Sequence, residues 1–180
     1  LTEQPQIEAV QLQINYLDYD DPGVQSKKCY DVAVKHGKKV MVMEPVKGGS
    51  LVKLPPEAKK VLDDLKGGSP ASYAIRFTAS FDGIFMVLSG MSDMDQMNDN
   101  ISYMKDFKPV SEEERKAVDR VCEIFRAQDL VACTACRYCV DGCPKNIPIP
   151  GIFACMNAKK TFGGGAFYYR LHTENAGKAS

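Results

Sequence analysis

The chain has 180 residues, 44% of them hydrophobic, and its 23 Lys and Arg residues are balanced by 23 Asp and Glu residues. This hydrophobic share is enough for a packed core and excludes wholesale disorder. The zero net charge argues against binding by long-range attraction to nucleic acid or to acidic membranes. No apolar run approaches the roughly 20 residues of a membrane helix. The first residues also lack the basic and apolar regions of a signal peptide.

Strand-like and helix-like stretches alternate from the start of the chain. Residues 10–16 alternate strictly between apolar and polar side chains and predict a strand. Apolar residues at helical spacing predict a helix over 24–36, which Gly37 ends. The continuous apolar run at 40–43 predicts a second strand, buried on both faces.

The same alternation continues beyond the second strand. The run at 84–88 predicts a third strand buried on both faces, and Ser92 or Asp93 is placed to cap the helix that follows. The helices predicted in this part of the chain cover 55–65, 70–79, 93–104 and 112–127. Strands separated by helices predict an α/β fold with a parallel sheet and right-handed crossovers.

The character of the sequence changes near Gln128, where Cys, Pro and short elements replace the alternating pattern. We therefore predict an α/β domain over 1–127 and a second, smaller region over 128–180. The tail from Thr161 is rich in Gly and polar residues and is predicted to be loose.

Four of the seven cysteines form one short run, Cys133, Cys136, Cys139 and Cys143, followed by Pro144. The spacing C-x2-C-x2-C-x3-C-P is typical of a 4Fe–4S cluster, because three closely spaced thiolates on a curling loop can hold three irons of one cube. Zinc prefers two C-x-x-C pairs a dozen or more residues apart, so a zinc-stabilised structural module is the weaker alternative. Without a sign of export, a disulfide framework is also weaker, and we predict a cytoplasmic protein.

The spacing leaves the fourth cluster ligand open. In two-cluster proteins the fourth Cys of such a run binds the other cluster, so Cys143 either closes a single cluster or belongs to a partner cluster. Cys155 is another candidate, although its apolar neighbours are typical of a buried structural thiol. Cys29 and Cys122 lie on predicted helices and are predicted to be core residues.

In parallel α/β folds, ligands bind where strands end and helices begin. At the first such position, Gln11, Gln13 and Asn15 share one face of the predicted strand. This polar face is either exposed to solvent or lines the lumen of a barrel. After the third strand, Gly90 allows the backbone to approach a ligand, and the helix N-terminus that follows suits a phosphate.

Four motifs coincide with these positions: Gln13-Ile14-Asn15-Tyr16, Met43-Glu44-Pro45-Val46-Lys47-Gly48-Gly49, Ser89-Gly90-Met91-Ser92 with Gln96 and Asn100, and the cysteine run with Lys145-Asn146-Ile147-Pro148-Ile149-Pro150. Together they resemble the aldo/keto reductase family, in the branch with a C-terminal ferredoxin-like domain. The resemblance implies the last three strands, with their helices, of a (β/α)8 TIM barrel. It also implies a small, mainly helical iron–sulfur module.

The resemblance further implies an NADP or NAD site. It places the Gln13 side chain at the nicotinamide carboxamide, the Met43–Gly49 turn along the cofactor, and the Ser89–Ser92 segment at its adenosine end. Met43 stands where many members stack an aromatic ring, and Gly90 and Gln96 stand where some members bind the 2′-phosphate with Lys and Arg. The implied cofactor residues are Gln13, Met43, Glu44, Gly90, Ser92, Gln96 and Asn100.

The resemblance also implies missing parts. The family's catalytic Asp, Tyr, Lys and His come from the first four strands, which do not precede Leu1, and a second cysteine run does not follow the first. We therefore expect a fragment that is inactive alone and that pairs with a missing barrel half, or with itself, through exposed strand edges. A redox partner protein is also expected, whereas nucleic acid and membrane partners are not.

A different class of function stays open at this stage. The chain would then be a non-enzymatic iron–sulfur subunit that transfers electrons or docks a partner, with the α/β part as a platform. The Ser89–Asn100 pattern disfavours this alternative, because a platform needs no close backbone approach beside a helix terminus.

Overall fold

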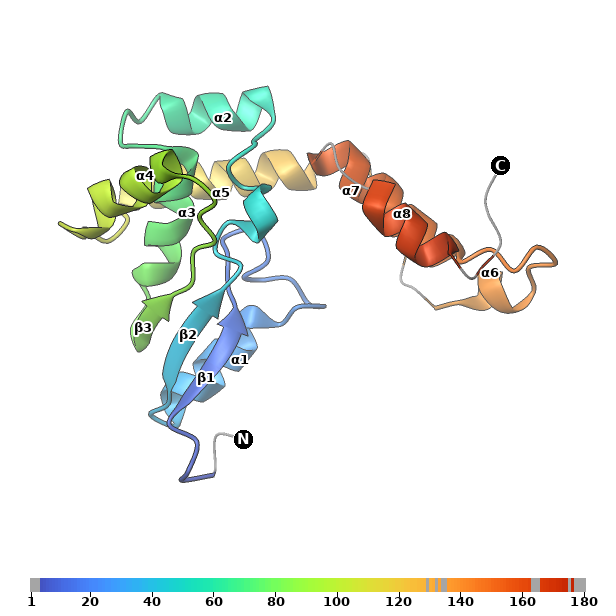
Figure 1. The fold of residues 1–180 in the computed structure, drawn as a ribbon, viewed down its shortest axis with the longest axis horizontal. Helices are drawn as coiled ribbons and strands as arrows, with labels where there is room; N and C mark the ends of the chain where they lie inside the picture. The colour runs from blue at the N-terminus through green and yellow to red at the C-terminus, as the bar shows by residue number, and fades with distance from the viewer. Residues whose placement is uncertain are drawn as a thin grey trace. The chain divides into compact units, whose positions relative to one another are not determined.

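A computed structural model of the chain describes residues 4–128, 130–131, 133, 136–162, 166–174 and 176. The chain divides into two compact units, Leu1–Ile124 and Phe125–Ser180. This division falls a few residues before the predicted boundary at 127/128. Figure 1 shows the elements of both units along the chain.

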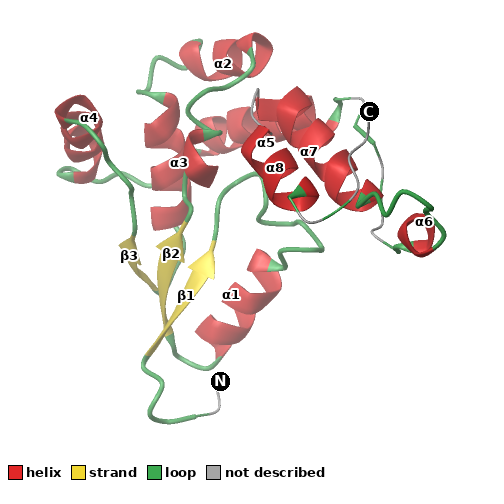
Figure 2. Cartoon of the chain, turned by 45° about the vertical axis from the view of Figure 1, so that its right-hand side comes forward, coloured by secondary structure: helices red, strands yellow, loops and turns green. Residues whose placement is uncertain are grey.

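The first unit contains a three-stranded parallel sheet in the order β1-β2-β3, with β1 at Ala9–Gln13, β2 at Lys39–Met43 and β3 at Ile84–Val87. Figure 2 shows the three strands side by side with β2 in the middle. The predicted parallel sheet is thus confirmed. The register between β2 and β3 shifts between Val40 and Met41, because Val40 pairs with Ile84 and Met41 with Met86. Phe85 is therefore the extra residue of a β-bulge.

β1 ends at Gln13, whereas the alternating pattern predicted a strand as far as residue 16. The reason is a local turn: the Asn15 Oδ1 atom accepts hydrogen bonds from the backbone N–H groups of Leu17, at 3.2 Å, and Asp18, at 2.9 Å. An Asn side chain that satisfies the following N–H groups replaces the partners that a strand ladder would supply.

Helices connect the strands and follow them. Their bounds agree with the predicted ranges to within a residue or two. The helices of the first unit, the last of which runs on to Arg126, are α1 (Ser26–Lys35), a short 3-10 helix (Lys47–Gly49), α2 (Pro56–Asp63), α3 (Pro70–Ala79), α4 (Met94–Met104) and α5 (Glu112–Arg126).

The core of the first unit lies between one face of the sheet and the helices α1 and α3. Val40 and Val42 of β2 are fully buried and pack with Tyr30 and Ala33 of α1. Phe77 of α3 adds edge-to-face contacts with Tyr16 and Tyr19, the geometry that aromatic pairs prefer.

The opposite face of the sheet is more open than predicted. The sequence pattern placed β2 and β3 in full burial on both faces, but Phe85 and Met86 are 45% and 44% exposed, and Met41 and Met43 are only half-buried. The prediction was wrong here because α1 and α3 cover a single face and β3 is an edge strand among the described residues.

The described elements of the second unit are helical: α6 (Tyr138–Asp141), α7 (Ile149–Phe162) and α8 (Ala166–Thr173). The tail predicted to be loose from Thr161 therefore contains a helix. α7 and α8 pack closely, since a Cβ atom added at Gly151 would lie 2.7 Å from Nδ1 of His172. None of the helices in the described ranges is long and apolar enough to cross a membrane.

Candidate functional site

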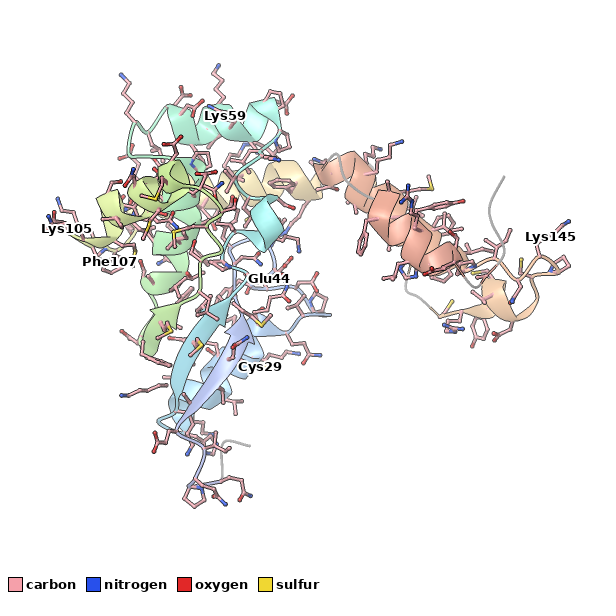
Figure 3. The ribbon with its side chains drawn as sticks, in the orientation of Figure 1. Cys29, Glu44, Lys59, Lys105, Phe107 and Lys145 are labelled. Carbon is pink, nitrogen blue, oxygen red and sulfur yellow. The ribbon has the colours of Figure 1, made fainter. Side chains whose placement is uncertain are left out.

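A cleft of about 740 Å³ lies at the carboxyl ends of β2 and β3. Its walls are the turn after β2, the start of α3, the loop after β3 and the first turns of α4. The lining residues are Glu44, Pro45, Val46, Gly48, Gly49, Val52, Lys53, Ser69, Ala71, Ile75, Leu88, Ser89, Gly90, Met91, Ser92, Asp95, Gln96, Asp99 and Asn100. Figure 3 labels Glu44, which directly follows the last residue of β2.

Glycines leave space along two walls of the cleft. Gly48 and Gly49 have φ values of 60° and 89°, in the left-handed region that favours glycine. A Cβ atom added at Gly48, Gly49 or Gly90 would meet no atom within 4 Å, so these positions leave room for a ligand close to the backbone. A cradle that side chains would fill is compatible with a bound dinucleotide.

Residues at the start of α4 engage part of its N-terminus. The Asp93 carboxylate accepts hydrogen bonds from Gln96, through the backbone N at 2.8 Å and through Nε2 at 2.6 Å. The Gln96 Oε1 atom in turn accepts a hydrogen bond from the backbone N of Ser92 at 3.0 Å. This reciprocal arrangement resembles a capping box, and it occupies N–H groups that sequence analysis had offered to a phosphate.

Asn100 positions the loop after β3. Its Nδ2 atom donates to Oγ of Ser89 at 2.7 Å, and its Oδ1 atom accepts a hydrogen bond from the Tyr103 hydroxyl. Burial raises the pKa of Tyr103, so this hydroxyl stays protonated and available as a donor. Both ends of the Asn100 amide are therefore engaged by the protein.

Five of the seven predicted cofactor residues line the cleft: Glu44, Gly90, Ser92, Gln96 and Asn100. Gln13 and Met43 are not among the lining residues, but they pair with each other in the β1–β2 register, at the adjoining strand ends. The Met43 Sδ atom accepts a hydrogen bond from Nε2 of Gln11 at 3.2 Å.

Sequence analysis missed a carboxylate that joins these strand ends. The Asp18 Oδ2 atom accepts hydrogen bonds from Nε2 of Gln13 and Nδ2 of Asn15, both at 3.1 Å, and from Nζ of Lys47 at 2.5 Å. Asn15 also donates to the backbone carbonyl of Glu44 at 3.4 Å. Asn15 is fully buried, so this member of the polar row is not part of a solvated face. The polar row was the sequence feature that could have revealed Asp18, because buried amide side chains require hydrogen-bond acceptors nearby.

The cysteine run lies in the second unit. Cys133, Cys136 and Cys139 are exposed and Cys143 is half-buried. Within the described residues, the structure gathers no group of three or more His, Cys, Asp or Glu side chains that could hold a metal ion.

The surroundings of Cys143 nevertheless suit a thiolate ligand. Its Sγ atom accepts a hydrogen bond from the backbone N of Ile147 at 3.5 Å. This bond, with further backbone N–H groups of Lys145 and Asn146, lowers the pKa of the Cys143 thiol. N–H groups directed at sulfur are the hydrogen bonds that tune iron–sulfur sites, so the donor chemistry fits a cluster.

The remaining cysteines divide between core and surface. Cys122 and Cys155 are buried, and burial raises the pKa of Cys155. Cys29 is exposed on α1, where the sequence had predicted a core residue (Figure 3). Tyr30 and Ala33 are the neighbouring residues of α1 that are buried and pack against the sheet.

The chain resembles known proteins over its first unit. Residues 1–123 match the sequence model of the aldo/keto reductase family, and this match ends before the cysteine run. Among curated proteins, none matches the chain.

Solved structures give the same fold. The apo form of the aldo-keto reductase AKR11C1 from Bacillus halodurans is 22% identical with a TM-score of 0.50, and the match covers 67% of this chain and 45% of that protein. The holo form of the same enzyme matches with the same identity and TM-score over 44% of its length. The chain therefore spans less than half of these structures, and its three-stranded sheet corresponds to part of their barrel. Because its own sequence matches the family over most of its length, the chain belongs to the aldo/keto reductase family.

Proposed function

We propose that the chain provides the dinucleotide-binding side of an NAD(P)-dependent aldo/keto reductase, joined to a 4Fe–4S electron-transfer module in its second unit. The observation that supports this proposal best is the cleft after β2 and β3. It brings five of the seven predicted cofactor residues together at the strand ends, where ligands bind in parallel α/β folds.

The size and lining of the cleft suit this ligand. Its volume of about 740 Å³ lies within the range of small-molecule and cofactor sites. The backbone at Gly48, Gly49 and Gly90 leaves space that a side chain would otherwise fill, because an added Cβ atom there meets nothing within 4 Å. Lys53 adds one positive charge to the wall, which favours a pyrophosphate.

The chain's own residues bind and orient rather than transfer protons. When bound, a nicotinamide cofactor supplies hydride chemistry. Asp18 fixes the Gln13 amide at the strand end through the 3.1 Å hydrogen bond. The lining residues that the structure describes include neither tyrosine nor histidine, two of the catalytic side chains that the resemblance implies for the family. We therefore expect this chain to bind a dinucleotide but not to reduce a carbonyl by itself.

Binding is tested by titrating the full chain with NADH and NADPH and following cofactor fluorescence. Gly90→Leu fills the cleft and should weaken binding by at least about tenfold. Gly142→Leu is the matched control, since an added Cβ atom also meets nothing within 4 Å there and Gly142 lies outside the cleft. Failure of both dinucleotides to bind at millimolar concentration would favour the docking-subunit alternative. Substrate-dependent NADPH oxidation by the purified chain would contradict the expected inactivity.

The cluster is tested separately by anaerobic reconstitution of the full chain with iron and sulfide. We expect a brown protein that contains iron and acid-labile sulfide, with the cluster bound by Cys133, Cys136, Cys139 and Cys143. Cys139→Ser should lower the iron content, whereas Cys29→Ser, at an exposed cysteine of α1 outside the run, should leave it unchanged. Colourless protein that retains zinc would instead support the structural module.

A further inference from the structure

We propose that the cleft selects NAD(H) over NADP(H), and that the Asp95 carboxylate sets this preference. The inference rests on the proposed function and goes beyond it, because the resemblance leaves the two dinucleotides open. It depends on the charges that line the cleft and on which of them are already engaged.

The cleft is acidic. Its ionisable lining residues are Glu44, Asp95 and Asp99 against Lys53 alone. NADP differs from NAD by a phosphate on the ribose. This phosphate would place roughly two further negative charges beside the acidic wall of the cleft. An Arg commonly accommodates that phosphate, whereas a carboxylate accepts hydrogen bonds from the free ribose hydroxyl. The described lining contains no Arg.

The N-terminus of α4 offsets this acidity only in part. Helix N-terminal N–H groups are the usual alternative binding site for a phosphate. Here the Asp93 carboxylate already accepts the hydrogen bond from the Gln96 backbone N at 2.8 Å, and Gln96 Oε1 accepts that of Ser92 N at 3.0 Å. A ribose phosphate would have to displace the Asp93 carboxylate or the Gln96 amide to reach these two groups.

Asp95 is distinguished from the other acids by its availability. Asp99 accepts a hydrogen bond from Oγ of Ser69 at 2.6 Å, which ties α4 to the start of α3. No hydrogen bond or ion pair within the described residues engages Asp95, which is exposed in the first turn of α4 and lines the cleft. Its oxygens are therefore free to accept from a ribose diol and to repel a ribose phosphate.

Lys53 has a different role under this proposal. As the single cation of the described lining, it neutralises part of the pyrophosphate that both dinucleotides share. Lys53→Ala should therefore weaken the binding of NADH and of NADPH by the same factor and leave the ratio of their dissociation constants unchanged. Asp95, in contrast, should act on the ratio.

The test measures the dissociation constants of NADH and NADPH for the full chain, and of 5′-AMP and adenosine 2′,5′-bisphosphate as probes without nicotinamide. The wild type should prefer NADH, and 5′-AMP among the probes, by about tenfold at low salt. Asp95→Asn should reduce this preference to about twofold, mainly because the ligand with the ribose 2′-phosphate binds more tightly to this variant. The preference should also shrink at high ionic strength, because salt screens the repulsion.

Asp106→Asn is the matched control, since it removes the same charge just beyond the end of α4 and outside the cleft. It should leave the ratio within about twofold of the wild type. Equal or tighter binding of NADPH by the wild type would overturn the preference. An unchanged ratio in Asp95→Asn would overturn the role of Asp95. Absence of binding by any of the four ligands, with a folded circular dichroism spectrum, would instead reject the proposed function itself.

Discussion

Asp18 is the acceptor shared by three side chains at the ends of β1 and β2. Its side chain is only 10% exposed, and it forms an ion pair of 2.5 Å with Lys47. Gln13 and Asn15 lie close to Asp18 in the sequence, but Lys47 comes from a distant segment, so no local pattern marks the ion pair. Residues such as Gln13 could be predicted from a motif, whereas the carboxylate that fixes them required the fold.

We predict that Asp18→Ala lowers the free energy of unfolding by about 2 kcal/mol. The variant leaves the Lys47 ammonium and the amides of Gln13 and Asn15 without their shared acceptor, and an unpaired, partly buried polar group costs the desolvation that its partner had offset. Urea denaturation measures the change. Asp20→Ala, at a neighbouring exposed position, should change stability by less than about 0.5 kcal/mol; similar losses in both variants would refute the role of Asp18.

At the scale of elements, Arg76 of α3 and Glu114 of α5 join two helices. The guanidinium donates two hydrogen bonds to the carboxylate, one of them at 3.1 Å, and both side chains are largely buried. Burial alone would raise the pKa of Glu114, but the hydrogen bonds from Arg76 and from Ser111 outweigh it and lower the pKa below the ordinary value. The pair is therefore formed with an ionised Glu114 at neutral pH.

This shift predicts an acid-sensitive contribution to stability. Because the pKa of Glu114 is lower in the folded chain than in the unfolded chain, its contribution is fully present above the ordinary pKa of 4.5 and is lost as the pH falls through the folded value. Glu114→Gln should remove that part of the pH dependence of stability. The measurement is the midpoint of urea denaturation at pH values between about 6 and 3. Glu113→Gln, at the exposed start of α5, should retain it; an identical pH profile in Glu114→Gln and the wild type would contradict the prediction.

The sequence predicted elements better than their surroundings. Asp93, one of the two residues predicted to cap α4, accepts the hydrogen bond expected of a cap, from Gln96 N, because caps depend on neighbours in the sequence. The burial of β3 was overestimated, since an apolar run shows what a strand can bury but not what covers it. The cysteine spacing likewise predicts a ligand set from local sequence alone, and within the described residues no group of three or more such side chains is gathered.

At the scale of the whole molecule, the open sheet is the dominant feature. In the described part of the chain, β1 and β3 each have one edge without a neighbouring strand, and Phe85 and Met86 are exposed on β3. Unpaired edges and apolar side chains favour association with further strands.

We therefore predict that the chain self-associates or pairs with a complementary barrel segment. Sedimentation should show oligomers that increase with concentration, and Met86→Lys should shift them toward monomer. Val32→Lys is the control, because Val32 is similarly exposed, at 46%, but lies on α1. A monodisperse monomer at high concentration would contradict the prediction.

The bulge in β3 has a consequence for how this sheet tolerates changes of length. Ile84 and Val87 pack on the same core although two residues separate them, because Phe85 has no counterpart on β2. Deletion of Phe85 would join Ile84 directly to Met86 and produce an unbroken ladder with the same partners on Val40, Met41 and Val42. A single-residue deletion, which ordinarily turns every later side chain to the other face, is at this position compatible with the existing core.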